Sequence, residues 1–287
     1  MTNIRSGITP VLPDHRNLSF PRTFGSVSPE TLPDEYSCEA GFSVPDQNAD
    51  GLPFGCSGYS QSELCQDEDG VRYSPEYTYR KGQLLDGTLG QEVGVTLKKS
   101  LKSLVVYGAL PGDVLFTDAT DTALDQVAGP QRRGRYFEVE DKTELDSFDD
   151  VRSALWLNRQ AKRPVSVGTP WFIEWGVPNP GGLNGILPDF YYNGNPNNYP
   201  WHNFKVSGWK QINGQSYLVG KPWQGPNYGD KGYVYFSREV FNKVMKIRET
   251  GAFTVARATP ADLQRVTLSI LETIVSYLRL ILSRLVT

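Results

Sequence analysis

The spacing of hydrophobic residues changes about half-way along the chain. The first half has the spacing of amphipathic helices, with apolar residues three and four positions apart and glycines after the ends. This spacing predicts helices over about 57–66, 95–106 and 147–160. Ser147 is a typical N-cap for the third helix, because its side-chain oxygen can accept a hydrogen bond from a free backbone N–H.

The second half contains short segments rich in β-branched and aromatic residues, which are typical of strands. They lie at 164–168, 204–212, 215–221 and 232–237. The sequence INGQ, between the second and third of these segments, is typical of a hairpin turn. Helices followed by strands predict an α+β fold in which helical and stranded residues are segregated into two lobes.

The two ends of the chain differ from this middle part. Residues 1–35 contain five prolines without a sustained period, and predict an extended arm across the surface of a domain over 36–250. The sequence Thr259-Pro260-Ala261-Asp262 is a strong helix start, and no Pro or Gly follows it. We therefore expect a third part, a C-terminal amphipathic helix over 259–287.

The helix predicted over 259–287 is mostly apolar, with one narrow polar stripe. Because the stripe repeats every seven residues, it favours self-association into a homo-oligomer. The apolar stretch is also close to the thickness of a bilayer, although Glu272 and Arg279 would be costly in lipid. Contact with a membrane, and docking on the chain's own domain, are therefore the alternatives.

The composition of the chain excludes some classes of function. With 39% hydrophobic and 12% aromatic residues among 287, the chain can bury a sizeable core. A net charge of −3 with scattered Lys and Arg gives no electrostatic footprint for nucleic acid. No cluster of residues has metal-ligand spacing, and we expect no cofactor. The first residues lack the apolar core of a Sec signal peptide, so we expect a cytoplasmic or virion-associated protein.

Two residues are candidates for nucleophilic chemistry. Cys56 follows a Gly-rich loop at the start of a predicted helix, where free N–H groups and the helix dipole lower the pKa of a thiol. His202 lies 146 positions later, at the start of a predicted strand. This distance is in the range of one class of cysteine peptidase. Taken alone, a single cysteine is more often a small buried residue.

Five segments around these residues resemble, in order, the motifs of one family. They are PDQNADGLPFGCSGYS (45–60), YSPEYTYRK (73–81), FDDVRSALWLNRQAKRPVSVG (148–168), HNFKVSGW (202–209) and GKPWQGPNYGDKGYVYF (220–236). Over about residues 31–240 the chain therefore resembles the papain-like cysteine peptidases (C1 family), in particular bacterial or bacteriophage members without a pro-domain. The resemblance implies a two-lobed fold, with the Cys56 helix in a helical lobe and His202 in a β-rich lobe.

The resemblance also implies a mechanism. Cys56 would attack the peptide bond of a peptide or protein substrate as a thiolate, paired with the imidazolium of His202. His202 would later donate the proton to the leaving amine. Gln47 and the backbone N–H of Cys56 would stabilise the oxyanion.

The third catalytic position departs from the family. Its asparagine falls on Pro222, which has no amide to orient His202. Gln224, a backbone carbonyl and packing under Trp223 are the candidates for that role. The alternative function is a catalytically impaired papain-like structural or binding module, for example a bacteriophage virion or tail component, assembled through its C-terminal helix.

Overall fold

The computed structural model describes residues 27–112, 145–176, 184–248 and 250–257, together with the strand residues 8–9 and 136–138. The chain forms one compact unit over Met1–Ala256 and a second over Arg257–Thr287. The helix predicted at 259–287 lies outside the described residues, and so do the expectations attached to it. Among the helices that the structure describes, none has the length and apolar character to span a membrane.

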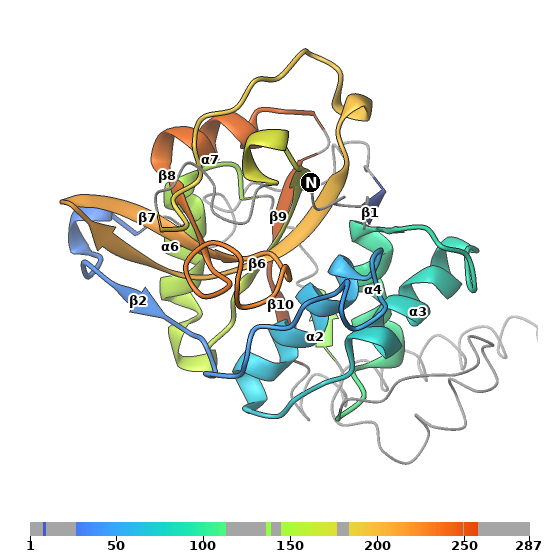
Figure 1. Ribbon diagram of the computed structural model, residues 1–287. Helices are drawn as coiled ribbons and strands as arrows, with labels where there is room; N and C mark the ends of the chain where they lie inside the picture. Colours follow the sequence, from blue (N-terminus) through green and yellow to red (C-terminus); the bar gives the residue numbers. More distant parts are fainter. Residues whose placement is uncertain are drawn as a thin grey trace, which may run out of the picture. The chain divides into compact units, whose positions relative to one another are not determined.

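Three helices pack on one another to form the helical lobe (Figure 1): α2 (Cys56–Asp69), α3 (Pro75–Asp86) and α4 (Leu97–Tyr107). The sequence predicted α2 and α4 to within a few residues. It did not predict α3, because the buried face of that helix carries Tyr, Thr, Lys and Gln rather than aliphatic residues. Gly58 lets α2 and α3 approach closely, since a Cβ there would lie 2.2 Å from the carbonyl oxygen of Pro75.

The second lobe is built on an antiparallel sheet in the order β8-β7-β6-β5-β9, with the short β2 also pairing with β6. Its strands are β2 (Tyr36–Ser37), β5 (Val165–Pro170), β6 (Trp201–Ile212), β7 (Gln215–Lys221), β8 (Val234–Ser237) and β9 (Gly251–Phe253). The turn between β6 and β7 is the predicted hairpin, with Asn213 and Gly214 both at positive φ.

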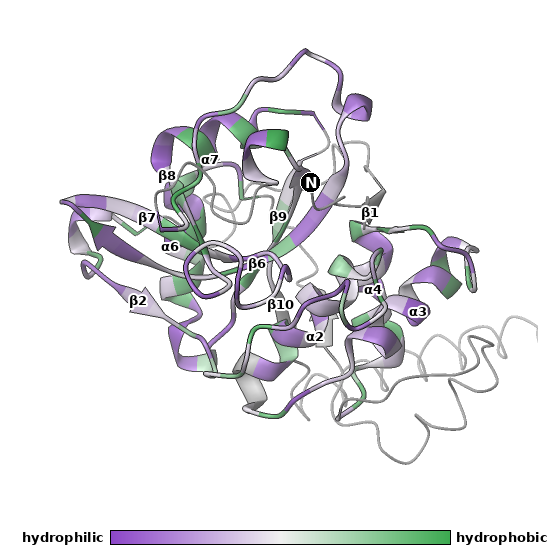
Figure 2. Ribbon diagram, in the orientation of Figure 1, coloured by the Kyte–Doolittle hydropathy of each residue, from purple (hydrophilic) through white to green (hydrophobic). Residues whose placement is uncertain are grey.

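Two helices pack with this sheet, α6 (Phe148–Leu157) and α7 (Arg238–Met245). Ser147 caps α6 as predicted, by accepting a hydrogen bond from the backbone N–H of Asp150 at 3.2 Å. Figure 2 shows hydrophobic residues along α6, α7 and β8, which contribute to the largest core cluster of the described residues. The two segregated lobes confirm the predicted α+β fold.

The remaining strands are short. They are β1 (Ile8–Thr9), β3 (Val95–Thr96), β4 (Tyr136–Glu138) and β10 (Val255–Arg257). Strand β1 pairs with β3 in parallel, with Ile8 opposite Val95. Four 3₁₀ turns connect other elements, at Pro29–Thr31, Arg159–Ala161, Ile173–Trp175 and Pro196–Asn198.

Candidate active site

The fold brings the cysteine and the histidine to one place. Cys56 is the first residue of α2, and His202 is the second residue of β6. These two elements pack against each other across the lobes. The backbone N–H of Asn203, the residue after His202, donates a hydrogen bond to Cys56 Sγ at 3.3 Å. The two candidate residues therefore lie side by side.

The imidazole of His202 is held by a backbone carbonyl. Its Nε2 lies 2.6 Å from the carbonyl oxygen of Pro222. A carbonyl oxygen only accepts hydrogen bonds, so Nε2 carries the hydrogen and Nδ1 of the neutral ring has a lone pair. Within the part of the chain that the structure describes, Nδ1 makes no hydrogen bond. The edge-to-face contact of Trp171, with ring centroids 4.8 Å apart, restricts the ring further.

Of the three candidates for orienting His202, the structure therefore selects the backbone carbonyl. Strand β7 ends at Lys221, and the backbone bends just after it, where Trp223 has a φ of 60°. At this bend the carbonyl of Pro222 points toward the imidazole of His202. The indole of Trp223 lies nearby, where it stacks on Tyr59 of α2 at a centroid distance of 6.0 Å. Gln224 instead forms a backbone bridge with Asp46.

Gln47 lies in the loop that leads into α2. Its backbone N–H donates to the carbonyl of Trp223 at 3.0 Å, which places the loop beside the histidine segment. Its side-chain Nε2 donates to the carbonyl of Pro53 at 3.1 Å, and the side chain is buried. An amide nitrogen carries two hydrogens, and this bond uses one of them.

Burial controls the ionisation of the pair. Cys56 and His202 are both 0% exposed. Burial raises the pKa of Cys56 to about 12, against the opposing hydrogen bond from Asn203. Burial also lowers the pKa of His202 to about 4, against the hydrogen bond to Pro222. The prediction of a lowered cysteine pKa and an ion pair is therefore wrong for this closed site, because desolvation of both charges outweighs the helix dipole.

The residues that bury Cys56 come from several elements. They form one cluster with it: Leu52, Tyr59, Tyr79, Val95, Trp201 and Trp223. Val95 belongs to β3, and β3 pairs with β1 of the N-terminal arm. Strand β1 also contacts β6, the strand of His202. Strand β1 thus lies at the edge of the site.

Three solved structures have similar folds, and the first of them is described as a cysteine protease. Xylellain from Xylella fastidiosa is 16% identical with a TM-score of 0.62, and the match covers 90% of this chain and 98% of that one. Procathepsin B S9 from Trypanosoma congolense is 16% identical, with a TM-score of 0.56 over 88% of this chain and 84% of that one. The bromelain protease from Ananas comosus is 15% identical, with a TM-score of 0.54 over 79% and 99%.

The chain has a papain-like fold. No protein-family model and no curated protein matches it.

A buried group of four charges connects the lobes of this papain-like fold behind the site. Glu63 of α2 accepts hydrogen bonds from Lys205 of β6 at 2.8 Å and from Lys221 of β7 at 2.7 Å. Lys205 also contacts Glu39 at 3.0 Å. Burial alone would raise the pKa of Glu39, but the two lysines outweigh it and lower that pKa to about 2. One carboxylate, Glu63, thus links the helix of Cys56 to the strand of His202 and to its neighbour β7.

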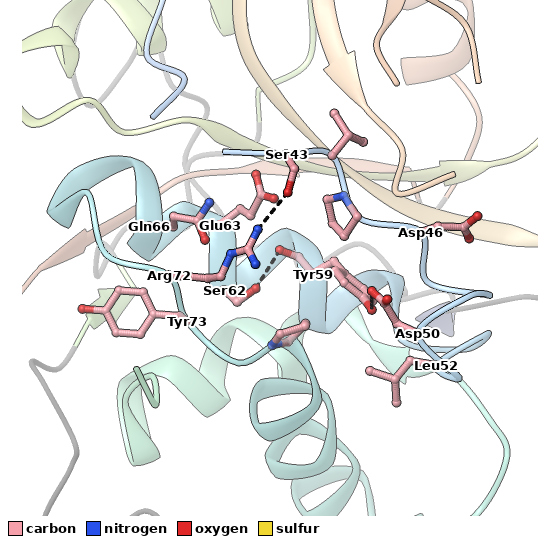
Figure 3. Close-up of a pocket in the computed structure, with 13 residues that line it drawn as sticks. Ser43, Asp46, Asp50, Leu52, Tyr59, Ser62, Glu63, Gln66, Arg72 and Tyr73 are labelled. Atoms are coloured by element: carbon pink, nitrogen blue, oxygen red, sulfur yellow. Dashed lines mark hydrogen bonds between the residues drawn. The ribbon is translucent and has the colours of Figure 1, made fainter. Parts of the chain in front are cut away.

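A cavity of about 440 Å³ lies elsewhere, between α2 and the loop before it (Figure 3). Arg72 crosses it to donate a hydrogen bond to Ser43 Oγ at 2.9 Å. Tyr59 donates to Asp50 at 2.6 Å on its wall. Neither Cys56 nor His202 lines this cavity. Among the described residues, no group of three or more His, Cys, Asp or Glu side chains is placed to hold a metal ion.

Sequence reasoning missed two residues at the site. Asn203 contacts the thiol through its backbone, and Trp171 packs on the imidazole. Asn203 had a signal, since it is a side-chain amide directly after the candidate His202. Trp171 had none, because it lies just after β5 and far from both motifs in sequence.

Proposed function

We propose that this protein is a cysteine peptidase that hydrolyses peptide bonds in peptide or protein substrates. The observation that carries the proposal is the arrangement at His202. Its Nε2–H is fixed on the Pro222 carbonyl, its Nδ1 has a free lone pair, and Cys56 Sγ accepts the N–H of the adjacent residue. The papain-like fold, shared with a protein named as a cysteine protease and with the bromelain protease, supports the same function.

The geometry supports the following reaction. Nδ1 of His202 takes the proton of the Cys56 thiol as Sγ attacks the carbonyl carbon of the substrate. The oxyanion that forms accepts hydrogen bonds from the backbone N–H of Cys56 and from Gln47 Nε2. The imidazolium, still bonded to Pro222 through Nε2, then gives its proton to the leaving amine. Water hydrolyses the resulting thioester, with His202 accepting a proton from it, and the thiol is restored.

The neutral pair of the closed site fits this sequence of steps. A neutral thiol can lose its proton as the bond to substrate forms, so an ion pair need not exist beforehand. Since both groups are buried, substrate must first displace part of the cluster around Cys56.

The test is hydrolysis of a diverse peptide mixture, with new amino termini identified by mass spectrometry. The full chain is expected to cleave, and Cys56→Ser and His202→Ala are expected to abolish cleavage. Cys65→Ser is the matched control, because Cys65 is another buried thiol of α2 that lies away from His202. Cleavage that survives Cys56→Ser would contradict the proposal. A folded wild type without cleavage would favour a structural or binding module.

A further inference from the structure

Behind the cysteine and histidine lies a buried group of polar side chains that the proposed reaction does not use. It comprises Ser60 and Gln61 of α2, Ser166 of β5 and Asn203 of β6, all of them 0% exposed. Polar groups in a core cost free energy unless they are hydrogen-bonded, so a cluster of this kind holds its members in one arrangement.

Asn203 is the member that reaches the reacting atoms. Its side-chain Nδ2 donates to Ser166 Oγ at 3.0 Å and to the carbonyl of Val167 at 2.9 Å. Ser166 Oγ is in turn 3.0 Å from Ser60 Oγ and accepts from Gln61 Nε2 at 3.1 Å. The side chain of Asn203 is therefore tied both to the neighbouring strand and to the helix of Cys56.

The backbone of Asn203 is in an unusual position. Pairing between β6 and β7 ends at Lys205, opposite Lys221, so beyond that point β7 no longer supplies main-chain partners. Two side chains take its place at Asn203. Cys56 Sγ accepts its N–H at 3.3 Å, and the indole Nε1 of Trp223 donates to its carbonyl at 2.9 Å. The thiol thus receives a backbone donor that a continuing strand would have used.

We propose that Asn203 is a positioning residue for the nucleophile: its side chain, anchored on Ser166 and Val167, holds its own backbone N–H against Cys56 Sγ. This inference rests on the proposed function and extends it. A hydrogen bond donated to sulfur favours the thiolate over the thiol, so it stabilises the sulfur as His202 removes the proton. The direction agrees with the effect of this bond on the pKa of Cys56, which it lowers against the larger effect of burial.

Titratable groups face Cys56 from three elements: His202 from β6, Tyr79 from α3 and Tyr59 from α2. Burial raises the pKa of Tyr79 to about 12, and that of Tyr59 still further with help from Asp50, so neither ionises near neutral pH. Because Tyr79 titrates in the same range as Cys56, the titration of Cys56 is taken as the difference from the same variant carrying Cys56→Ser, which removes the tyrosine contribution.

The test compares Asn203→Ala with Asn242→Ala. The control also removes an amide that bonds to the main chain in the β-rich lobe, where Asn242 accepts from the N–H of Phe148 at 2.8 Å, but it is remote from the site. The first readout is the ultraviolet absorbance of the thiolate against pH, taken as the difference from the same variant carrying Cys56→Ser. The second is kcat and KM for a cleaved peptide.

Asn203→Ala is expected to raise the apparent pKa of Cys56 by about one unit, because a hydrogen bond to the charged sulfur is lost. It is expected to lower kcat about tenfold with little change in KM. Asn242→Ala is expected to change stability only. Ser166→Ala, which leaves the bond to Val167, should shift the titration in the same direction by less, and it serves as the second variant if Asn203→Ala does not fold.

Equal thiolate titrations in wild type, Asn203→Ala and Ser166→Ala would overturn the inference and leave Asn203 a merely structural residue. The thiolate titration needs no peptidase activity. A chain that cleaves no peptide but shows the shift would therefore reject the proposed function while keeping the role of Asn203 toward the thiol.

Discussion

The carbonyl oxygen of Pro222 accepts the Nε2–H of His202 at 2.6 Å. Pro222 lacks the side-chain amide that the resemblance leads us to expect at this position. Its backbone carbonyl supplies the hydrogen-bond acceptor for His202 instead. An asparagine would do the same work with its side-chain oxygen: it would hold the imidazole in one tautomer with the lone pair on Nδ1.

The first prediction follows from this contact. Pro222→Ala keeps the carbonyl and is expected to change kcat/KM by no more than about threefold, and Pro222→Asn is not expected to raise it, because the ring already has its acceptor. The measurement is peptide hydrolysis under saturating and limiting substrate. An increase of about tenfold or more in Pro222→Asn would mean that the carbonyl does not orient His202.

The second prediction concerns the reactivity of Cys56. With a pKa of about 12, only about one Cys56 in ten thousand is thiolate at pH 8, so iodoacetamide should modify it slowly in the folded protein. The rate should rise about tenfold per pH unit. Because Cys38 and Cys65 are buried too, we expect no preferential labelling of Cys56 over them in the closed site.

Deletion of residues 1–26 should make iodoacetamide label Cys56 faster than Cys65. Strand β1 pairs with β3, whose Val95 packs in the cluster of Cys56, so loss of the arm should expose Cys56 and leave Cys65 protected. Peptide mapping of the alkylated cysteines reads both rates. Fast labelling of Cys56 in the intact chain at neutral pH would instead show that the ion pair exists there.

The third prediction concerns Glu63. Its replacement by alanine leaves Lys205 and Lys221 buried with only Glu39 as the acidic partner described here, so it should cost about 3–5 kcal/mol in the free energy of unfolding. Denaturant titration measures this cost. Glu76→Ala is a suitable control, because Glu76 is equally buried but contacts Arg80, which is 20% exposed, within α3 at 3.6 Å. Equal losses in the two variants would contradict the role of Glu63.

The fourth prediction is the response of the protein to acid. The pKa of Glu39 is about 2 in the fold, and 4.5 is its ordinary value. A lowered carboxyl pKa stabilises the fold above the ordinary value, and that contribution is lost as pH falls from about 4.5 toward 2. His202 acts in the same sense at higher pH, because the unfolded chain binds a proton below 6.5 while the fold does not until about 4. Glu39→Gln should flatten the lower part of the stability curve, and an unchanged curve would contradict this assignment.

The fifth prediction comes from the sequence of residues 259–287. Its heptad-spaced polar stripe predicts that the full chain sediments as a closed oligomer, and that a chain ending at Ala258 sediments as a monomer. A full-length monomer without detergent would contradict the oligomer. Solubility that depends on detergent would favour a membrane contact instead.

Local patterns predicted much of the fold, and the reasons are visible in particular elements. Ser147 and the apolar spacing after it predicted α6, and Asn213-Gly214 predicted the hairpin, because capping and turn chemistry depend on adjacent residues. Helix α3 was not predicted, because the residues on its buried face are mostly polar and lack the aliphatic spacing of an amphipathic helix.

The proximity of Cys56 and His202 could be predicted from the sequence, but the electrostatics of the pair could not. The resemblance and the spacing indicated Cys56, His202 and Gln47, and the fold places the first two together. The pKa values depend on how completely other elements exclude water, and that information is spread over residues from at least four elements. Likewise, the choice of the Pro222 carbonyl over Gln224 depends on the path of the backbone rather than on a residue type.

A hydrogen bond to a main-chain carbonyl responds to mutation differently from a hydrogen bond to a side chain. No codon change at position 222 removes a main-chain carbonyl, so mutational scanning for loss of activity would report two essential side chains at this site and overlook the third group. Sensitivity would appear instead at neighbours that set the direction of the chain, above all Trp223 with its φ of 60°. Substitution of residue 222 should therefore be tolerated, whereas a change in the turn that directs its oxygen to His202 should not be.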